Sequence, residues 1–263
     1  MKHFINIFIN LFKQKNFFEA LKKLIKKFEK NTSIEAKNWA KLNTKYSTEE
    51  FCRSIDNALF DKILADIKLI ENEAKNKLLK LNVNIGGGGN YVLLYFLVIK
   101  FRPNYIVETG VAAGWSSLAI LRGLKKNSTG YLFSSDLPYY RIKNPEQYIG
   151  YLAKNEENKK NWYLDIRGDD LALPEISKRI ANEKINLFHY DSDKSYSARN
   201  KALNILSSNI DSETIIIFDD IQDNVHFKNL VKKTKQKYCI LEFQNKFVGV
   251  VGDKIFLNNE FKN

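Results

Sequence analysis

From residue 105 onward, short runs rich in β-branched and aromatic residues alternate with longer stretches of helical periodicity. The runs lie at residues 105–108, 131–135, 162–166, 185–190, 214–218, 238–243 and 247–251. Segments long enough for helical crossovers separate the first five runs, which is typical of a mostly parallel sheet covered on both faces. Only three residues separate the last two runs, so these must pair as an antiparallel hairpin. The pattern predicts an α/β fold with a doubly wound, seven-stranded, mostly parallel sheet that ends in an antiparallel hairpin.

The region before this alternation is predicted to be helical. Residues 1–45 contain eleven lysines and three acidic residues, and the chain as a whole has a formal net charge of +12. We expect this basic arm to form two short amphipathic helices, which either pack on their own domain or contact an anionic membrane surface or a partner. Residues 46–102 are predicted to form a helical cap that begins at a capping box, Ser47 to Glu50, and leads into a core domain at residues 103–263.

A run of four glycines, Gly86 to Gly89, interrupts the helical region. Consecutive glycines hold regular structure only at a large cost in conformational entropy. The run is therefore predicted to be a hinge, a plain linker or a place where the backbone approaches a ligand closely.

Composition excludes several classes of protein. With 44% hydrophobic and 27% charged residues, the chain can bury a sizeable core. Its two cysteines, Cys52 and Cys239, lie far apart, which supports neither a disulfide framework nor a thiolate zinc site and favours a reducing compartment. Because no apolar run is long enough to span a bilayer and no signal-peptide pattern is evident, we expect a soluble, cytoplasmic protein.

Polar residues collect where the predicted strands end, which is where ligands bind in open parallel sheets. The first strand runs into E-T-G-V-A-A-G-W-S-S, from Glu108 to Ser117, which is typical of a small-residue turn before a helix. Backbone N–H groups at such a helix start attract a carboxylate or phosphate. Ala112 and Trp115 replace the second and third glycines of a G-x-G-x-x-G motif, so a nicotinamide cofactor is disfavoured.

Acidic residues end the next two strands. Asp136 follows the second strand, where it can accept hydrogen bonds from ribose hydroxyls. Asp169 and Asp170 follow the third, and one of them is expected either to cap the next helix or to contact an adenine amino group.

Three further carboxylates are expected to converge. Asp191 follows the fourth strand, and Asp219 and Asp220 follow the fifth, which we expect to be its neighbour. Their mutual repulsion needs a cation or strong hydrogen-bond donors, and oxygen ligands suit Mg²⁺, Ca²⁺ or Mn²⁺ rather than zinc. The alternative is that one acid caps a helix and another only orients its loop. His189, inside the fourth strand, is interpreted as a buried core residue outside the site, and His226 borders the pocket without a defined direction.

The ordered motifs E-T-G-V-A-A-G-W-S-S, S-S-D, G-D-D, Y-D-S-D-K-S-Y and I-F-D-D resemble those of class I S-adenosylmethionine-dependent methyltransferases. More narrowly, they resemble the small-molecule O-methyltransferases related to catechol O-methyltransferase and to the bacterial macrocin and cephalosporin-cluster enzymes. The resemblance covers about residues 86–256 and implies a Rossmann-like methyltransferase fold.

The resemblance also implies which residues surround S-adenosylmethionine. These are Glu108, Gly110, Ala112, Gly114, Ser116, Asp136 and Asp169. Among them, Ser116 matches the position that binds the methionine carboxylate, Asp136 the acid on the ribose, and Asp169 the position that contacts adenine. Ala112 departs from the usual middle glycine, a change that the catechol-type branch tolerates.

For catalysis, the resemblance implies a divalent metal, with Mg²⁺ expected, held by Asp191, Asp219 and Asp220. Lys194 matches the lysine that serves as the base in the catechol branch, and Asp193 is the competing base. A dication and a sulfonium nearby would lower the pKa of Lys194, making the neutral amine accessible near pH 7. The alternative is a solvated lysine at a helix start.

We therefore predict an S-adenosylmethionine-dependent O-methyltransferase, assisted by a divalent metal, that acts on a hydroxyl of a small molecule or sugar in surface-polysaccharide or secondary-metabolite assembly. Tyrosines at positions 139, 140, 148 and 151 form an aromatic wall for the acceptor or else pack against helices. No specific nucleic acid is expected as a partner, and the sequence is compatible with a homo-oligomer. The alternatives are a nucleic-acid methyltransferase that uses the basic arm for phosphate contacts and a cofactor-binding module without turnover.

Overall fold

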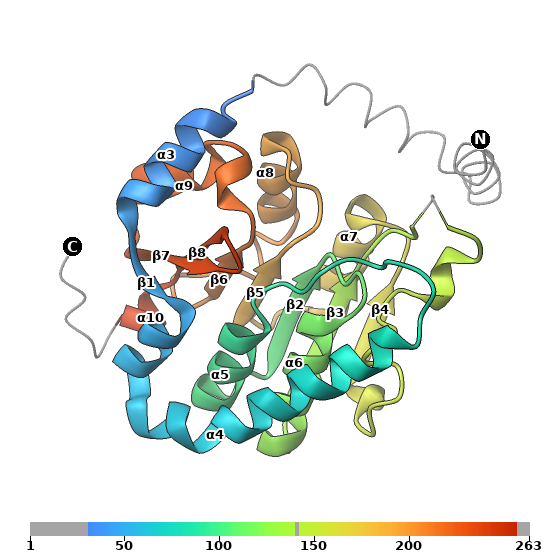
Figure 1. Ribbon diagram of the computed structural model, residues 1–263. Coiled ribbons are helices and arrows are strands. Elements are labelled where there is room, and N and C mark those ends of the chain that lie inside the picture. The colour runs from blue at the N-terminus through green and yellow to red at the C-terminus, as the bar shows by residue number, and fades with distance from the viewer. Residues whose placement is uncertain (1–30, 140–141, 257–263) are drawn as a thin grey trace.

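The computed structural model describes residues 31–139 and 142–256 (Figure 1). The strands are β1 (Thr44–Ser47), β2 (Tyr105–Thr109), β3 (Tyr131–Ser135), β4 (Trp162–Asp165), β5 (Leu187–Tyr190), β6 (Ile215–Phe218), β7 (Tyr238–Phe243) and β8 (Lys246–Val251). The α-helices are α3 (Ser33–Asn43), α4 (Thr48–Leu79), α5 (Tyr91–Phe101), α6 (Trp115–Asn127), α7 (Asp169–Ile180), α8 (Tyr196–Ile205), α9 (His226–Thr234) and α10 (Asp253–Phe256). Short 3-10 helices are η2 (Pro145–Gln147), η3 (Lys159–Asn161) and η4 (Ile221–Asp223).

The described strands form one eight-stranded sheet in the order β1-β7-β8-β6-β5-β2-β3-β4. Neighbouring strands are parallel except at β8, which runs antiparallel to both β6 and β7. The predicted α/β fold, with a mostly parallel sheet and a terminal antiparallel hairpin, is confirmed. The sheet has one strand more than the seven predicted.

The additional strand, β1, pairs in parallel with β7 at the edge of the sheet. Its four residues alternate between half-buried and exposed positions. The helix before it, α3, packs on α9, where Glu35 pairs with Lys228 at 2.7 Å and the rings of Trp39 and Phe227 lie 6.2 Å apart. Residues 31–47, part of which belongs to the predicted basic arm, are thus built onto the sheet domain. The two amphipathic helices expected before them fall on residues 1–30, outside the described residues.

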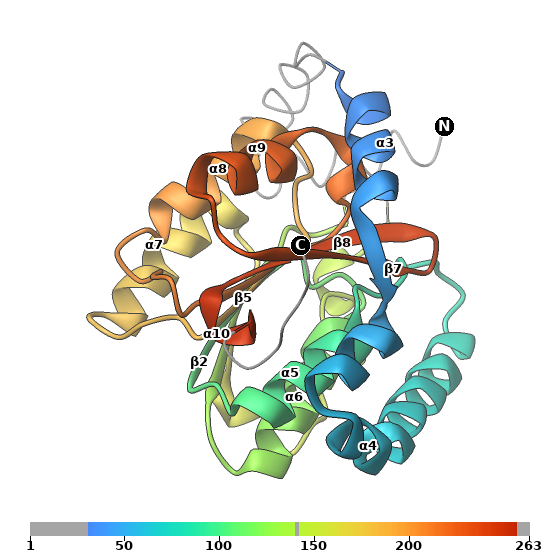
Figure 2. The same ribbon diagram turned by 90° about the vertical axis from the view of Figure 1, so that its left-hand side faces the viewer.

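Helices cover both faces of the sheet (Figure 2). On one face lie α4, α5 and α6, and on the other lie α7, α8 and α9. Each face of the sheet has its own hydrophobic core. Within β6, Ile215 and Ile217 belong to the core beside α4–α6, while Ile216 and Phe218 belong to the core beside α7–α9. Burial on both sides explains why the parallel strands are continuously apolar.

The predicted capping box begins α4: the Ser47 hydroxyl accepts the Glu50 N–H, and Glu50 accepts the Ser47 N–H. The predicted helical region runs to Leu79 with one interruption at Asp56, whose backbone is not helical. Asp56 caps the helix again, because its carboxylate accepts the Leu59 N–H at 2.9 Å. None of the helices in the described ranges combines the length and apolarity required to cross a membrane.

The order of the strands reverses at β2, which lies between β3 and β5. Backbone hydrogen bonds continue past the carboxyl ends of these strands, from Gly110 to the Ser135 carbonyl, from Asp191 to Thr109 and from Asp219 to Tyr190. The loops after β2, β3, β5 and β6 therefore form one continuous edge, where an open parallel sheet binds its ligands.

Candidate active site

The loop between β2 and α6 bends sharply on small residues. Gly110 and Gly114 have φ of 79° and 94°, and Ala112 also lies in the left-handed region at 48°. A Cβ on Gly110 would lie 2.5 Å from the Asp191 carbonyl oxygen, so only glycine allows this bend to lie against the loop after β5. Gly114 is the N-cap of α6 and makes no side-chain cap. The first-turn amides of α6, including that of buried Ser116, are thus placed to bind an anionic group.

Glu108 ends β2 as a fully buried acid. Its Oε2 accepts hydrogen bonds from the hydroxyls of Ser117 at 2.6 Å and Ser134 at 2.8 Å, which fixes the bend to α6 and β3. Burial alone would raise the pKa of Glu108, but the imidazole of His189 outweighs burial and lowers it. The acid is therefore ionised, and it holds the frame of the loop rather than pointing to solvent.

Asp136 reaches the same loop from the end of β3. Its carboxylate accepts the N–H of Ala112 and the N–H of Leu137, each at 2.6 Å. Burial raises the pKa of Asp136 to about 7, although the two amide hydrogen bonds lower it. This places the predicted ribose acid beside the bend.

Asp169 links two neighbouring strand ends. Its carboxylate accepts hydrogen bonds from the hydroxyl of Ser135, at the end of β3, and from that of Ser192, after β5. The N-cap of α7 is Gly168, which makes no side-chain cap. The alternative of an acid that caps this helix is therefore wrong, and Asp169 lies at the edge of the sheet with the predicted cofactor residues.

The acids after β5 and β6 lie side by side, as predicted. The parallel pairing of Tyr190 with Phe218 brings Asp191 next to Asp219. Burial and the neighbouring Asp219 raise the pKa of Asp191 to about 6. Asp220 takes a left-handed backbone conformation with φ of 53° and turns its carboxylate to Gln222, Lys194 and Lys246.

Lys194 lies inside this group of acids rather than in solvent. Its ammonium contacts the Asp191 carboxylate and lies 3.2 Å from Asp220 Oδ2. Burial lowers the pKa of Lys194, but the carboxylates of Asp191 and Asp220 outweigh burial, so the pKa is raised. Without ligands, Lys194 is thus charged. The expected neutral amine assumed a metal dication and the cofactor's sulfonium nearby, both of which would lower the pKa of Lys194. The other predicted base, Asp193, accepts the backbone N–H of Ser195 at 2.9 Å.

His189 is the residue that sequence reasoning left out. It is fully buried and stands between Glu108 and Asp219, with Nδ1 3.9 Å from Glu108 Oε1 and Nε2 3.6 Å from Asp219 Oδ2. Burial lowers the pKa of His189, but the two carboxylates raise it to about 10. A signal existed, because in a strand His189 shares the face of Asp191, two residues on.

The glycine run closes over this group. A Cβ on Gly88 would lie 2.9 Å from the Trp115 ring, and one on Gly89 would lie 2.8 Å from Asp219 Oδ2. Just before the run, the Tyr139 hydroxyl donates to the Ile85 carbonyl at 2.6 Å. Of the three possibilities open for this run, the close approach of backbone to a site is the one that the structure shows.

Two other predicted features lie elsewhere. Tyr139, Tyr148 and Tyr151 are partly buried and pack against the core beside α4–α6, and Tyr140 is outside the described residues. His226 is buried between α8 and α9, where Nε2 lies 3.2 Å from Asn200 Oδ1 and the ring packs on Phe218.

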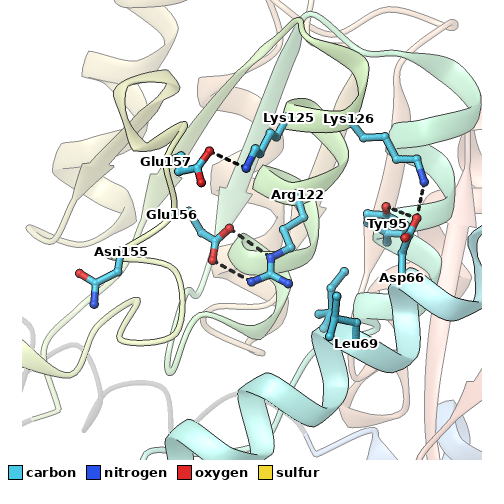
Figure 3. Close-up of a pocket in the computed structure, with 10 residues that line it drawn as sticks. Asp66, Leu69, Tyr95, Arg122, Lys125, Lys126, Asn155, Glu156 and Glu157 are labelled. Carbon is cyan, nitrogen blue, oxygen red and sulfur yellow. Dashed lines mark hydrogen bonds and ion pairs between the residues drawn. The ribbon is translucent and has the colours of Figure 1, made fainter.

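A hollow of about 470 Å³ lies between α4, α6 and residues 155–157 (Figure 3). Its charged side chains pair with one another: Arg122 with Glu156, Lys125 with Glu157, and Lys126 with Asp66. It contains none of the predicted site residues. These ion pairs join α6 to α4 and to residues 156–157, so we do not assign the hollow a ligand.

The comparisons with known proteins agree with this geometry. A family model described as a methyltransferase domain matches residues 107–221, a segment that contains every predicted site residue. The search of curated proteins gives no match.

Solved structures share the fold at low sequence identity. An O-methyltransferase from Bacillus cereus in complex with S-adenosylhomocysteine has a TM-score of 0.54 and 15% identity, covering 70% of this chain and 90% of its own. A protein from Staphylococcus aureus, provisionally described as a caffeoyl-CoA O-methyltransferase, has a TM-score of 0.53 and 13% identity over 73% and 98% of the two chains. A methyltransferase from Podospora anserina with bound S-adenosylhomocysteine has a TM-score of 0.52 and 10% identity over 70% and 86%.

At these identities the solved structures show the fold, and the family model adds the chemistry of its domain. Residues 107–221 therefore match a methyltransferase domain, and the described fold is that of solved methyltransferases, which agrees with the family that the sequence motifs predict.

Proposed function

We propose that the protein transfers the methyl group of S-adenosylmethionine to a hydroxyl of a small molecule or sugar, with the assistance of a divalent cation. One observation carries this proposal: the glycine bend after Glu108 lies directly against the acids after β5, since a Cβ on Gly110 would lie 2.5 Å from the Asp191 carbonyl. A cofactor in the bend and a hydroxyl at the acids would thus be neighbours. Two of the similar structures are described as O-methyltransferases.

The residues of the acid group suit a divalent cation. Asp219 Oδ1 is buried and, among the described residues, has no hydrogen-bond partner. Asp191 and Asp219 are mutually repulsive, and buried like charges are stable only with a compensating cation or donors. Of the three predicted ligands, Asp191 is paired with Lys194 and Asp220 with both Lys194 and Lys246, whereas Asp219 has no lysine partner among the described residues.

In the proposed reaction, S-adenosylmethionine supplies an electrophilic methyl group and the cation lowers the pKa of a hydroxyl bound to it. The chain's own residues align the two partners: Asp136 and the start of α6 hold the cofactor, and Asp191 and Asp219 define the acceptor side. Lys194, beside Asp191, is placed to accept the hydroxyl proton. Because the carboxylates raise its pKa, Lys194 must first lose its own proton.

The acceptor is proposed to be a small molecule or carbohydrate, and the cytoplasm is the proposed compartment. The second point is supported by Cys52 and Cys239, both buried and free, which suit a reducing environment.

The experiment that tests this function measures methyl transfer to a panel of catechols and glycosides, with Mg²⁺ or Mn²⁺ and with chelator. We expect Asp219→Ala to lower turnover by about 100-fold or more while S-adenosylhomocysteine binding is retained, because Asp219 lies on the acceptor side. Full activity of Asp219→Ala, or equal activity with chelator, would remove the metal from the reaction. Cofactor binding without transfer to any hydroxyl of the panel would favour a module without turnover.

A further inference from the structure

His189 occupies an unusual place for a strand residue of an apolar sheet. Its side chain is fully buried in β5, and its register partner on β2 is the buried acid Glu108. Among the described residues, neither ring nitrogen has a hydrogen-bond partner. An imidazole buried without partners is costly, so its surroundings need a ligand that satisfies it.

The imidazole points into the acid group. One ligand atom each from His189, Asp191 and Asp219 lie within 4.8 Å of one another, the one such group of three found in the described part of the chain. Two other buried oxygens nearby, Glu108 Oε1 and Asp219 Oδ1, also lack a hydrogen-bond partner there. Four buried polar atoms without a hydrogen-bond partner among the described residues thus belong to three adjoining side chains, with the His189 ring between Glu108 and Asp219.

Gly89 covers the same three residues. A Cβ at Gly89 would lie 2.8 Å from Asp219 Oδ2, 3.1 Å from His189 Cε1 and 3.3 Å from Asp191 Oδ2. The glycine therefore lets the backbone approach these three residues more closely than any other residue type would. Two carboxylates and one imidazole with ligand atoms this close together form a donor set for a metal ion.

Lysines compensate the charge of Asp220, the third predicted metal ligand, but not that of every acid in the group of His189, Asp191 and Asp219. Asp220 pairs with both Lys194 and Lys246, and Lys194 also pairs with Asp191. Over the described ranges, no lysine or arginine lies within ion-pair distance of the Asp219 carboxylate, whose basic neighbour there is His189 at 3.6 Å. Within those ranges, Asp219 therefore lacks the lysine partner that Asp191 and Asp220 each have.

We infer that His189 is a direct ligand of the divalent cation, together with Asp191 and Asp219, and that Asp220 holds Lys194 instead of the metal. This inference rests on the proposed metal-assisted function and changes its donor set from three oxygens to two oxygens and one nitrogen. Imidazole suits transition metals, whereas Mg²⁺ takes oxygen ligands. The site is therefore selective for a transition metal such as Mn²⁺, Fe²⁺ or Co²⁺ over Mg²⁺.

The test uses the full chain with S-adenosylhomocysteine bound, and Mn²⁺ as the probe. Electron spin echo measurements on bound Mn²⁺ should show coupling to a nitrogen, and labelling of histidine with ¹⁵N should change that coupling, which separates an imidazole from Lys194. In competition, Mn²⁺ should bind more tightly than Mg²⁺.

The matched variants are His189→Phe and His226→Phe, two buried histidines of which only the first lies at the acids. His189→Phe should lose the nitrogen coupling and bind Mn²⁺ about 100-fold more weakly, and His226→Phe should behave as the unaltered chain. Binding of S-adenosylhomocysteine reports that each variant is folded. If a variant does not fold, the nitrogen coupling measured on the unaltered chain still tests the assignment of His189.

Bound Mn²⁺ without histidine coupling would overturn the assignment of His189 and leave the metal-assisted function standing. If the unaltered chain binds S-adenosylhomocysteine but neither Mn²⁺ nor Mg²⁺, both this inference and the metal part of the proposed function fail.

Discussion

The chemistry of Asp136, His189 and Lys194 depends more on their neighbours than on residue type. Burial raises the pKa of Asp136 to about 7, and paired carboxylates raise that of His189 to about 10. Lys194 is charged because its neighbours are acids. The sequence motifs locate Asp136 and Lys194 correctly at the strand ends. They do not find His189, because two of the acids around it, Glu108 and Asp219, are distant from it in sequence.

The raised pKa of Asp136 predicts how the cofactor binds as the pH changes. The ionised carboxylate accepts ribose hydroxyls better than the neutral acid, so the affinity for S-adenosylhomocysteine should rise by up to about tenfold from about pH 6 to about pH 8. Titration calorimetry across this range measures it. Asp136→Asn should bind more weakly and lose the pH dependence; an unchanged dependence in this variant would assign it to another group.

The same shift acts on stability with a defined sign. Between the ordinary value of 3.8 and the folded value of about 7, the folded chain binds more protons at Asp136 than the unfolded chain does. This residue therefore lowers the free energy of unfolding as the pH rises through that window. In denaturant titrations without ligand, Asp136→Asn should reduce that loss relative to the unaltered chain.

Two glycines of one run provide a matched pair of substitutions. A Cβ on Gly89 would meet Asp219 Oδ2 at 2.8 Å, whereas one on Gly87 would meet nothing within 4 Å. Gly89→Ala should displace the Asp219 carboxylate and lower turnover by about 10- to 100-fold, with little change in S-adenosylhomocysteine affinity. Gly87→Ala should leave steady-state turnover unchanged. Equal effects of the two substitutions would mean that the run acts through flexibility rather than through the space above Asp219.

Among the helices, α8 has a structural role in the site that its sequence does not reveal. Its Arg199 is fully buried and donates one guanidinium nitrogen to the carbonyls of both Asp219 and Asp220, at 3.0 and 2.9 Å. This fixes the backbone after β6, including the left-handed conformation of Asp220. Arginine on an amphipathic helix usually indicates a solvated face, so a single-helix pattern cannot predict this contact.

Replacing Arg199 by methionine leaves both carbonyls without this donor. We expect the free energy of unfolding to fall by about 1–3 kcal/mol, because part of the loss is offset by relief of a buried charge whose pKa is lowered by burial. Lys201→Met, two positions along α8 at a solvent-exposed ion pair with Asp170, should change it by less than about 0.5 kcal/mol. Urea unfolding of the two variants compares them directly, and equal values would contradict the role given to Arg199.

The whole fold follows from the sequence more closely than the site does. Continuous apolar strands separated by helical stretches are enough to predict a parallel sheet with two covered faces, and the short connection between β7 and β8, two residues in the structure, requires a hairpin. The edge strand β1 is missed because Thr44–Ser47 is short and polar and forms only against β7. Likewise, the direction of Asp220 depends on Lys194 and Lys246, which no local pattern of residues contains.

Binding of S-adenosylhomocysteine to the full chain tests the central claim most directly. We expect one molecule per chain in titration calorimetry, and stabilisation by about 2.7 kcal/mol at a ligand concentration 100 times the Kd. Chelator should leave this binding intact, since Asp136 and the bend from Gly110 to Gly114 contact no metal in this account. Absence of both heat and thermal stabilisation at millimolar ligand would contradict the assignment of the bend as the cofactor site.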